Sequence, residues 1–233
     1  MSTTDPGPPD VDLDRVWVGV AAQVWRREPG WVERLAGRLL RSPGLARALV
    51  TTPSLLLGWL IATVVVVLIG MVAALGTGTP YVALLAPAVA GAGIAYSYGP
   101  GIDPAWEVSR SMAVSDQMVL LVRALAVFGL NAALGLAASA ASGAAADVTF
   151  GWLVPMTAVS ALALAVATVT RSANIGVAAG LAGWAITVLS VQTASGHFTA
   201  ATTSTALVLP YLAVAAACGG ITWYATRIPR GTP

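Results

Sequence analysis

Charged side chains are rare in this sequence, and a group of them lies in one segment, residues 99–123, which reads GPGIDPAWEVSRSMAVSDQMVLLVR. Long apolar runs stand on both sides of this segment. Its charged residues are Asp103, Glu107, Arg110, Asp116 and Arg123. Side chains of both signs on a short loop can bind a complementary protein surface through ion pairs and hydrogen bonds. We therefore predict that a partner protein binds here.

The sequence lacks the residues of the common catalytic and metal sites. The ATP-binding motif G-x-x-x-x-G-K-[ST] needs a lysine, and all 12 Lys/Arg positions are arginines. The one histidine, His197, lies near Ser195, but no G-x-S-x-G turn is present. The one cysteine, Cys218, excludes an internal disulfide and a zinc site built on several cysteines. We expect no enzyme activity, no cofactor and no metal in this chain.

The composition predicts an all-α integral membrane protein. Hydrophobic residues make up 57% of the chain and charged residues only 9%, whereas soluble domains carry about 25% charged residues. The apolar runs are continuous rather than alternating, which is typical of membrane helices and not of outer-membrane barrels. The pI near 9.0 does not indicate a nucleic-acid partner, because arginines in a membrane protein first report its topology.

Six transmembrane helices are predicted within residues 48–226. Two charge-free stretches, 48–102 and 172–226, are each long enough for two spans of about 20 residues. Glycine, proline and isolated charges mark the turns between the other runs. The predicted spans cover about 54–75, 81–98, 118–141, 151–170, 174–191 and 206–224, with a loop over 99–117 and a cytoplasmic tail over 227–233.

The N-terminal part is predicted to hold two amphipathic helices in residues 12–47, after a disordered tail over 1–11. Asp12 can cap the first helix, which extends to Arg27. The second, Trp31–Arg41, places Trp31, Leu35 and Leu39 on one face and Arg34, Arg38 and Arg41 towards the other. Such a helix can lie in the membrane interface or pack on a partner protein.

The arginines predict the topology. Seven arginines precede the first span, two lie in the central loop, Arg171 lies between the fourth and fifth spans, and two follow the sixth. The other three turns contain none. The rule that basic residues stay on the cytoplasmic side then places both termini in the cytoplasm, and the protein in the cell membrane. Asp147 and His197 are expected on the outer side.

Small residues recur at helical spacing in two of the predicted spans. One set is Gly176 and Gly180, and the other is Gly135, Ser139 and Gly143. Faces of this kind allow two membrane helices to approach closely.

Proline and one amide stand out within the apolar runs. Pro87, Pro155 and Pro210 are expected to kink the second, fourth and sixth spans. Asn131 is the most deeply placed strongly polar side chain, and it can either join helices or contact a substrate. We therefore mark Asn131 and Pro155 as candidates for a substrate path.

The central loop is predicted to form a short helix, a turn and a helix that enters the membrane. Asp103 can cap the short helix, with Pro104 in its first position. Glu107 suits the first turn because of the helix dipole, and Trp106 adds apolar surface. Ser115 can cap the helix that continues through the basic residue at the start of the third span.

This loop resembles the loop between spans two and three of ABC-2 type exporter permeases. That loop has an acidic residue in a short helix, a Leu-rich run, Pro-Val-Ser and then a basic residue. Glu107, Ala113-Val114-Ser115 and Arg123 match, whereas Ala113 replaces the proline and Arg110-Ser111 interrupts the Leu-rich run. Six spans, an interfacial N-terminal helix and the missing ATP motif agree with the same family.

The resemblance implies a permease subunit that moves a hydrophobic or amphipathic substrate. A separate ATPase subunit would hold ATP and Mg and dock on the loop, and a second permease copy would complete the pathway, packed partly through the small-residue faces. The coupling residues would be Asp103, Trp106, Glu107, Arg110, Val114, Ser115 and Arg123. The alternative is a membrane-bound regulator or scaffold whose N-terminal segment binds a soluble protein.

Overall fold

A computed structural model of the chain describes residues 12, 14–19, 30–41, 53–77, 81–98, 116–141 and 150–227. The chain divides into two compact units, Met1–Ala46 and Arg47–Pro233. All of the regular elements in the described ranges are helical. The predicted tail over 1–11, most of the central loop and the segment after residue 227 lie outside these ranges.

In the first unit, both predicted helices are present over the residues that the structure describes. Residues 14–19 are helical, and the backbone N–H of Arg15 donates to Asp12 Oδ1 over 3.1 Å, which confirms the predicted cap. Helix α2 covers Trp31–Leu40 and ends at Arg41, which adopts a left-handed conformation with φ 48°. Glu33 lies in its first turn and Arg38 in its last turn, and both charges suit the helix dipole.

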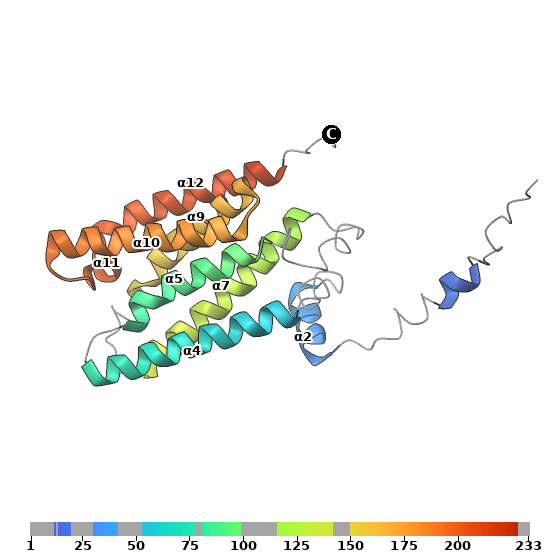
Figure 1. Cartoon of the computed structure of the whole chain (residues 1–233), viewed down its shortest axis with the longest axis horizontal. Coiled ribbons are helices and arrows are strands. Elements are labelled where there is room, and N and C mark those ends of the chain that lie inside the picture. The colour runs from blue at the N-terminus through green and yellow to red at the C-terminus, as the bar shows by residue number, and fades with distance from the viewer. Residues whose placement is uncertain are drawn as a thin grey trace, which may run out of the picture. The chain divides into compact units, whose positions relative to one another are not determined.

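The second unit contains six longer helices among its described residues (Figure 1). Two short elements, α11 (Ala200–Thr203) and the 3-10 turn η1 (Thr205–Leu207), separate the last two long helices. The long helices are α4 (Pro53–Thr77), α5 (Tyr81–Tyr96), α7 (Asp116–Ala141), α9 (Leu153–Thr170), α10 (Ala173–Ser195) and α12 (Val208–Arg227).

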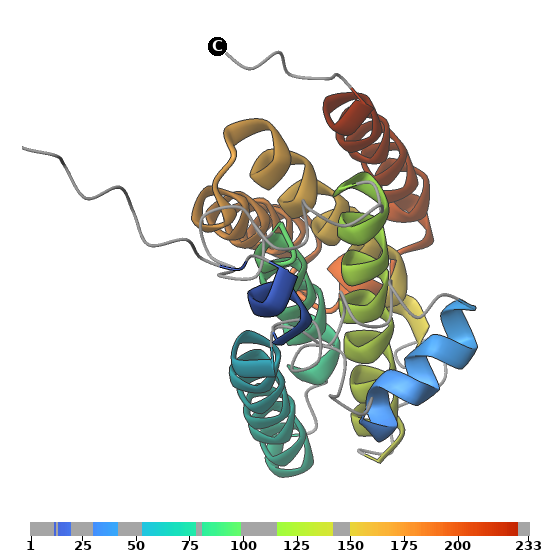
Figure 2. The same cartoon turned by 90° about the vertical axis from the view of Figure 1, so that its right-hand side faces the viewer.

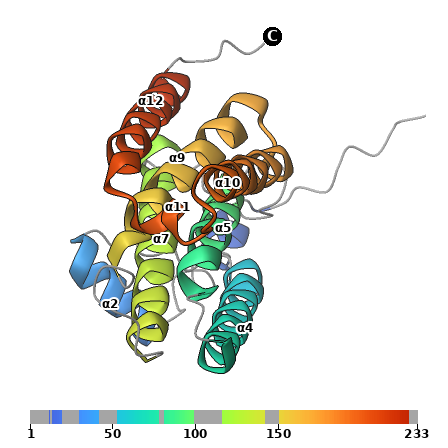
Figure 3. The same ribbon diagram turned by 90° about the vertical axis from the view of Figure 1, so that its left-hand side faces the viewer.

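Helices α5 and α9 form the centre of this bundle. Helix α9 packs against α5, α10 and α12, while α5 also packs against α4, α7 and α10. Figures 2 and 3 look at the bundle from opposite ends and place α4 and α12 at opposite edges of it. The side chains of α9 are accordingly the most buried of the four long apolar helices.

Four helices in the described ranges are long and apolar enough to cross a membrane. They cover Gln117–Ala141, Leu153–Thr170, Ala173–Ser195 and Thr205–Arg227, and they correspond to the last four predicted spans. Helix α5 has 16 residues and the Thr63–Thr77 part of α4 is also short, although both are apolar. A multi-pass membrane protein is therefore supported, and the six-span count stays a prediction.

The three prolines lie at two kinds of position in the helices. Pro87 lies inside α5 as expected. Pro155 is the third residue of α9, and Pro210 is the third residue of α12, directly after η1. A proline in the first turn removes an N–H that has no partner within the helix. Pro155 and Pro210 therefore lie in the first turns of α9 and α12, and a kink of these spans stays a prediction.

The glycine face of α10 allows close helix packing, as predicted, and does so within this one chain, whereas on α7 Gly135 faces a side chain and Gly143 lies outside the described residues. A Cβ atom added to Gly176 would lie 2.6 Å from the backbone oxygen of Ala163, and one added to Gly180 would lie 3.0 Å from Ala163 Cβ. A Cβ atom added to Gly135 would lie 2.6 Å from the ring of Trp152. The backbone of α10 therefore rests directly on α9, and α7 makes room for the indole of Trp152.

Candidate functional site

Most residues of the predicted coupling loop lie outside the described ranges. These are Asp103, Trp106, Glu107, Arg110, Val114 and Ser115. The structure describes the two helix ends that the loop joins, α5 with the turn through Tyr98, and α7 from Asp116 onwards. The site is therefore built from what holds these two ends.

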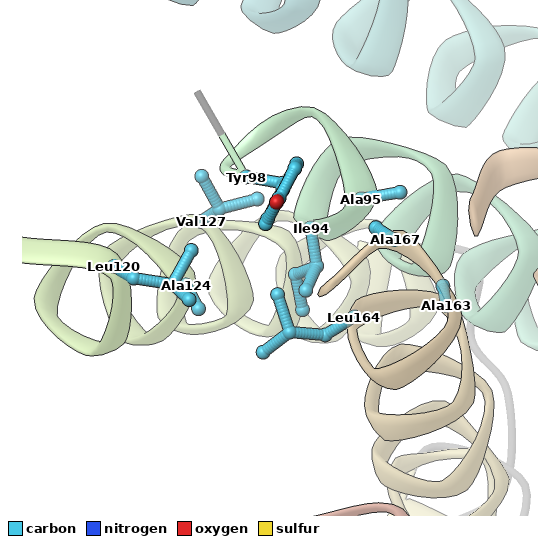
Figure 4. Packing of buried hydrophobic residues seen from close by; sticks show 9 residues of the cluster. All are labelled: Ile94, Ala95, Tyr98, Leu120, Ala124, Val127, Ala163, Leu164 and Ala167. Carbon is cyan, nitrogen blue, oxygen red and sulfur yellow. The ribbon is translucent and has the colours of Figure 1, made fainter. Parts of the chain in front are cut away.

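Both ends are anchored in one buried apolar cluster, which we call the loop-base cluster. Three helices contribute to it: the last turns of α5, the first half of α7 and the second half of α9 (Figure 4). Small alanines from all three helices allow the larger side chains to meet between them. The cluster consists of Ile94, Ala95, Tyr98, Leu120, Ala124, Val127, Ala163, Leu164 and Ala167.

Arg123 lies on α7 directly beside this cluster. Its side chain is only 8% exposed, although a basic residue at the border of a span is expected to face water. Side chains on a helix lean towards its N-terminus, so Arg123 leans towards the end of α7 that joins the loop. Buried arginines are almost always paired, and Arg123 takes part in a polar or electrostatic interaction in this structure.

The turn between α9 and α10 lies at the same end of the bundle. Arg171 ends α9 in a left-handed conformation with φ 56°, and its N–H donates to the Ala167 oxygen of the loop-base cluster. Ser172 caps α10 by accepting a hydrogen bond from the N–H of Ile175. Tyr96 Oη donates to Asn174 Oδ1 over 3.3 Å, which joins the end of α5 to the start of α10.

Three helix termini that carry arginines therefore lie at the same end of the bundle. Figure 1 shows the start of α7, the α9–α10 turn and the end of α12 on the same side. Arg123, Arg171 and Arg227 belong to these ends. The guanidinium of Arg227 lies 4.2 Å from the ring centre of Trp223, a cation–π contact. This is the arrangement that the distribution of arginines predicts.

The two candidates for a substrate path occupy different environments. Asn131 is 5% exposed, and its Nδ2 donates to the Val127 oxygen over 2.8 Å within α7 itself. This hydrogen bond does not tie α7 to another helix. Pro155 is fully buried at the start of α9, beside Trp152 and Met156, which pack against alanines of α5.

A hydrogen bond between α5 and α10 was not predicted. Pro87 lacks the N–H that would bind the Ala83 oxygen, and its ring disturbs the carbonyl groups of the preceding turn. Trp184 Nε1 donates to the Leu84 oxygen in this turn over 2.8 Å. A tryptophan within an apolar helix, opposite a proline in a neighbouring span, is a signal that such a bond can form, because a buried indole N–H usually has a hydrogen-bond partner.

The segment between α10 and α12 also differs from a simple outer loop. Ala201 and Thr202 of α11 are buried, and Tyr211 Oη donates to the Ala201 oxygen over 2.8 Å. A Cβ atom added to Gly151 would lie 2.6 Å from the Thr202 oxygen. This segment therefore packs against the bundle at the start of α9.

Comparison with known protein families, curated proteins and solved structures finds no match to this chain.

Proposed function

We propose that this chain is the membrane-embedded permease subunit of an ABC-2-like exporter. The observation that carries the proposal is the loop-base cluster. A force on the loop between α5 and α7 reaches α9 directly through the apolar side chains that all three helices share. Because α9 contacts α5, α10 and α12, a tilt of these helix ends would be passed to most of the bundle.

In this proposal the residues of the site have two roles. The loop residues Asp103, Glu107 and Arg110 contact a separate ATPase subunit, which holds ATP and Mg. Arg123 is buried, and it acts by holding the loop end of α7 rather than by touching the partner. Few charges interrupt the long apolar helices, which favours a hydrophobic or amphipathic substrate.

Affinity purification of the full chain in a mild detergent tests the proposal directly. An ATPase with Walker motifs should come with the chain. A soluble DNA-binding or regulatory protein in its place would favour the alternative, a membrane-bound regulator or scaffold. The exposed apolar residues of α2, Trp31 and Leu35, are the observation that keeps this alternative open.

Most residues of the small-residue faces are covered by this chain itself, so a second permease copy would have to bind through other surfaces. Gly176 and Gly180 already contact α9, and Gly135 contacts Trp152, while Ser139 is buried. The expectation that a dimer packs through these four residues is therefore corrected, because the same chain covers them. Native mass spectrometry of the purified complex would report the number of copies.

Glu107→Ala is predicted to weaken binding of the ATPase while leaving the amount of folded chain unchanged. An exposed charge in the first turn of a helix contributes about 0.3–1 kcal/mol, too little to unfold the bundle. Arg110→Glu should have the same effect on binding. Asp147→Ala removes a carboxylate on the predicted outer side and serves as the matched control. The measurement is the ATPase-to-permease ratio after purification, and an unchanged ratio for both loop variants refutes the coupling role.

Labelling of single cysteines is predicted to place the loop between α5 and α7 and the α9–α10 turn in the cytoplasm, and the turn after α10 outside. In a Cys218→Ala background, an impermeant maleimide added to intact cells should label His197→Cys, because His197 is exposed in the turn after α10. It should not label Arg110→Cys or Arg171→Cys until the cells are opened. Labelling of either arginine position from outside would rule out this topology.

A further inference from the structure

Helix α2 carries an exposed apolar stripe beside an exposed basic stripe. Trp31 is 73% exposed and Leu35 is 51% exposed, and they lie one turn apart on the same face. Arg34 and Arg38 are also exposed and are likewise one turn apart. At 3.6 residues per turn, the two stripes adjoin each other within about 100° around the helix axis.

The charge of α2 indicates what kind of surface covers it. Arg34 and Arg38 lie on the helix and Arg41 ends it, whereas Glu33 is its one acidic residue. The helix therefore presents a net positive charge next to a tryptophan and a leucine. Arginine stems can lie along an apolar layer while the guanidinium groups reach phosphate, and guanidinium binds phosphate in a bidentate geometry.

The covalent chain limits how far α2 can move from the start of α4. Eleven residues separate Arg41 from Pro53, the first residue of the apolar helix α4. Even when fully extended, this connection spans only about 40 Å. If α4 enters the membrane as predicted, α2 cannot move further than this from the membrane surface, so its local concentration there is high.

We propose that α2 lies in the cytoplasmic membrane surface and binds anionic phospholipid headgroups through Arg34, Arg38 and Arg41. Trp31 and Leu35 enter the boundary between headgroups and acyl chains, and the three guanidinium groups contact the phosphates. Basic amphipathic helices with aromatic and leucine side chains on the apolar face bind membranes in this way, and they do so more strongly when the lipids are anionic. The inference rests on the membrane location of α4 and does not require a transport function.

The test uses the full chain reconstituted into vesicles of phosphatidylcholine, with or without phosphatidylglycerol. A fluorophore is attached at Leu35→Cys in a Cys218→Ala background, and its quenching by spin-labelled acyl chains reports contact with the bilayer. Gly37→Cys, on the opposite side of α2, is the matched labelling control. We expect several-fold stronger quenching at position 35 than at position 37 in anionic vesicles, and weaker quenching in phosphatidylcholine alone.

Charge variants separate headgroup binding from plain apolar insertion. Arg34→Gln/Arg38→Gln and Arg34→Glu/Arg38→Glu should lower the quenching at position 35 in anionic vesicles progressively, and salt should weaken it through screening. Arg15→Glu/Arg26→Glu makes the same charge change outside α2 and should have no effect.

Three outcomes would overturn the proposal. Equal quenching in both kinds of vesicle, unaffected by the charge variants, would mean apolar insertion without recognition of headgroups. Exposure of both labels to water would place α2 away from the membrane. Protection of position 35 only after a soluble protein is added would assign this face to a protein partner. No ATPase is present in this assay, so its result is independent of the exporter proposal.

Discussion

Gly176→Leu is expected to leave little folded protein. A Cβ atom at this position would lie 2.6 Å from the Ala163 oxygen and 2.7 Å from Ala167 Cβ. Both neighbours belong to α9 and cannot turn aside, so α9 and α10 would have to separate. Overpacking by extra methylene groups typically costs about 1–3 kcal/mol, occasionally more, and a whole leucine side chain at a backbone contact belongs to the upper part of that range.

The measurement is the fraction of chain that remains monodisperse in detergent after heating. Gly219→Leu is the matched control, because it places the same side chain on α12, where a Cβ atom would meet nothing within 4 Å. Gly176→Ala should have an intermediate effect. If Gly176→Leu and Gly219→Leu lose the folded protein at the same temperature, α9 and α10 do not pack as described.

The positions of the long helices could be predicted from hydropathy alone. Spans predicted over 118–141, 151–170, 174–191 and 206–224 correspond to four apolar helices because a continuous apolar run can satisfy its backbone in lipid only as a helix. The spacing of Gly176 and Gly180 also predicted a close helix contact. It could not identify α9 as the partner, since a face of small residues fits a neighbouring span and a second copy equally well.

Helix starts and short elements were harder to predict. Pro155 and Pro210 fall within apolar runs, and hydropathy does not show that α9 starts after Trp152 or that α12 follows the 3-10 turn η1. Residues 192–205 have no apolar period, so α11 could not be foreseen. Its buried part depends on hydrogen bonds with distant residues, such as the one from Tyr211 Oη to the Ala201 oxygen.

Of the predicted coupling residues, Arg123 is the one that the described ranges include. The sequence identified Arg123 as the basic residue where a span begins, and α7 does begin seven residues before it. Its side chain is buried on the face of α7 that also carries Leu120 and Ala124 of the loop-base cluster. A charge beside an apolar run suggests a water-facing position, and only tertiary packing decides otherwise.

Trp152 is fully buried directly before α9, where its ring lies among alanines of α5 and beside Gly135 of α7. Trp152→Ala removes the whole indole from its contacts with Met156, Ala83 and Ala86. Truncation of a buried tryptophan to alanine typically costs about 3–5 kcal/mol, so we expect a loss of folded protein comparable to that of Gly176→Leu. Trp223→Ala, at an exposed position in α12, is the matched control and should change stability little.

A pair of smaller substitutions tests the contact itself. Gly135→Ala should destabilise the bundle, because its methyl group would lie 2.6 Å from the Trp152 ring. Trp152→Phe shortens that ring, and it breaks no hydrogen bond because the buried Trp152 Nε1 has no partner among the described residues. The double variant should therefore be more stable than the sum of the two single effects predicts, by about 0.5–3 kcal/mol for residues in direct contact. Strictly additive effects would mean that Gly135 and Trp152 do not touch, and that α7 approaches the start of α9 at another residue.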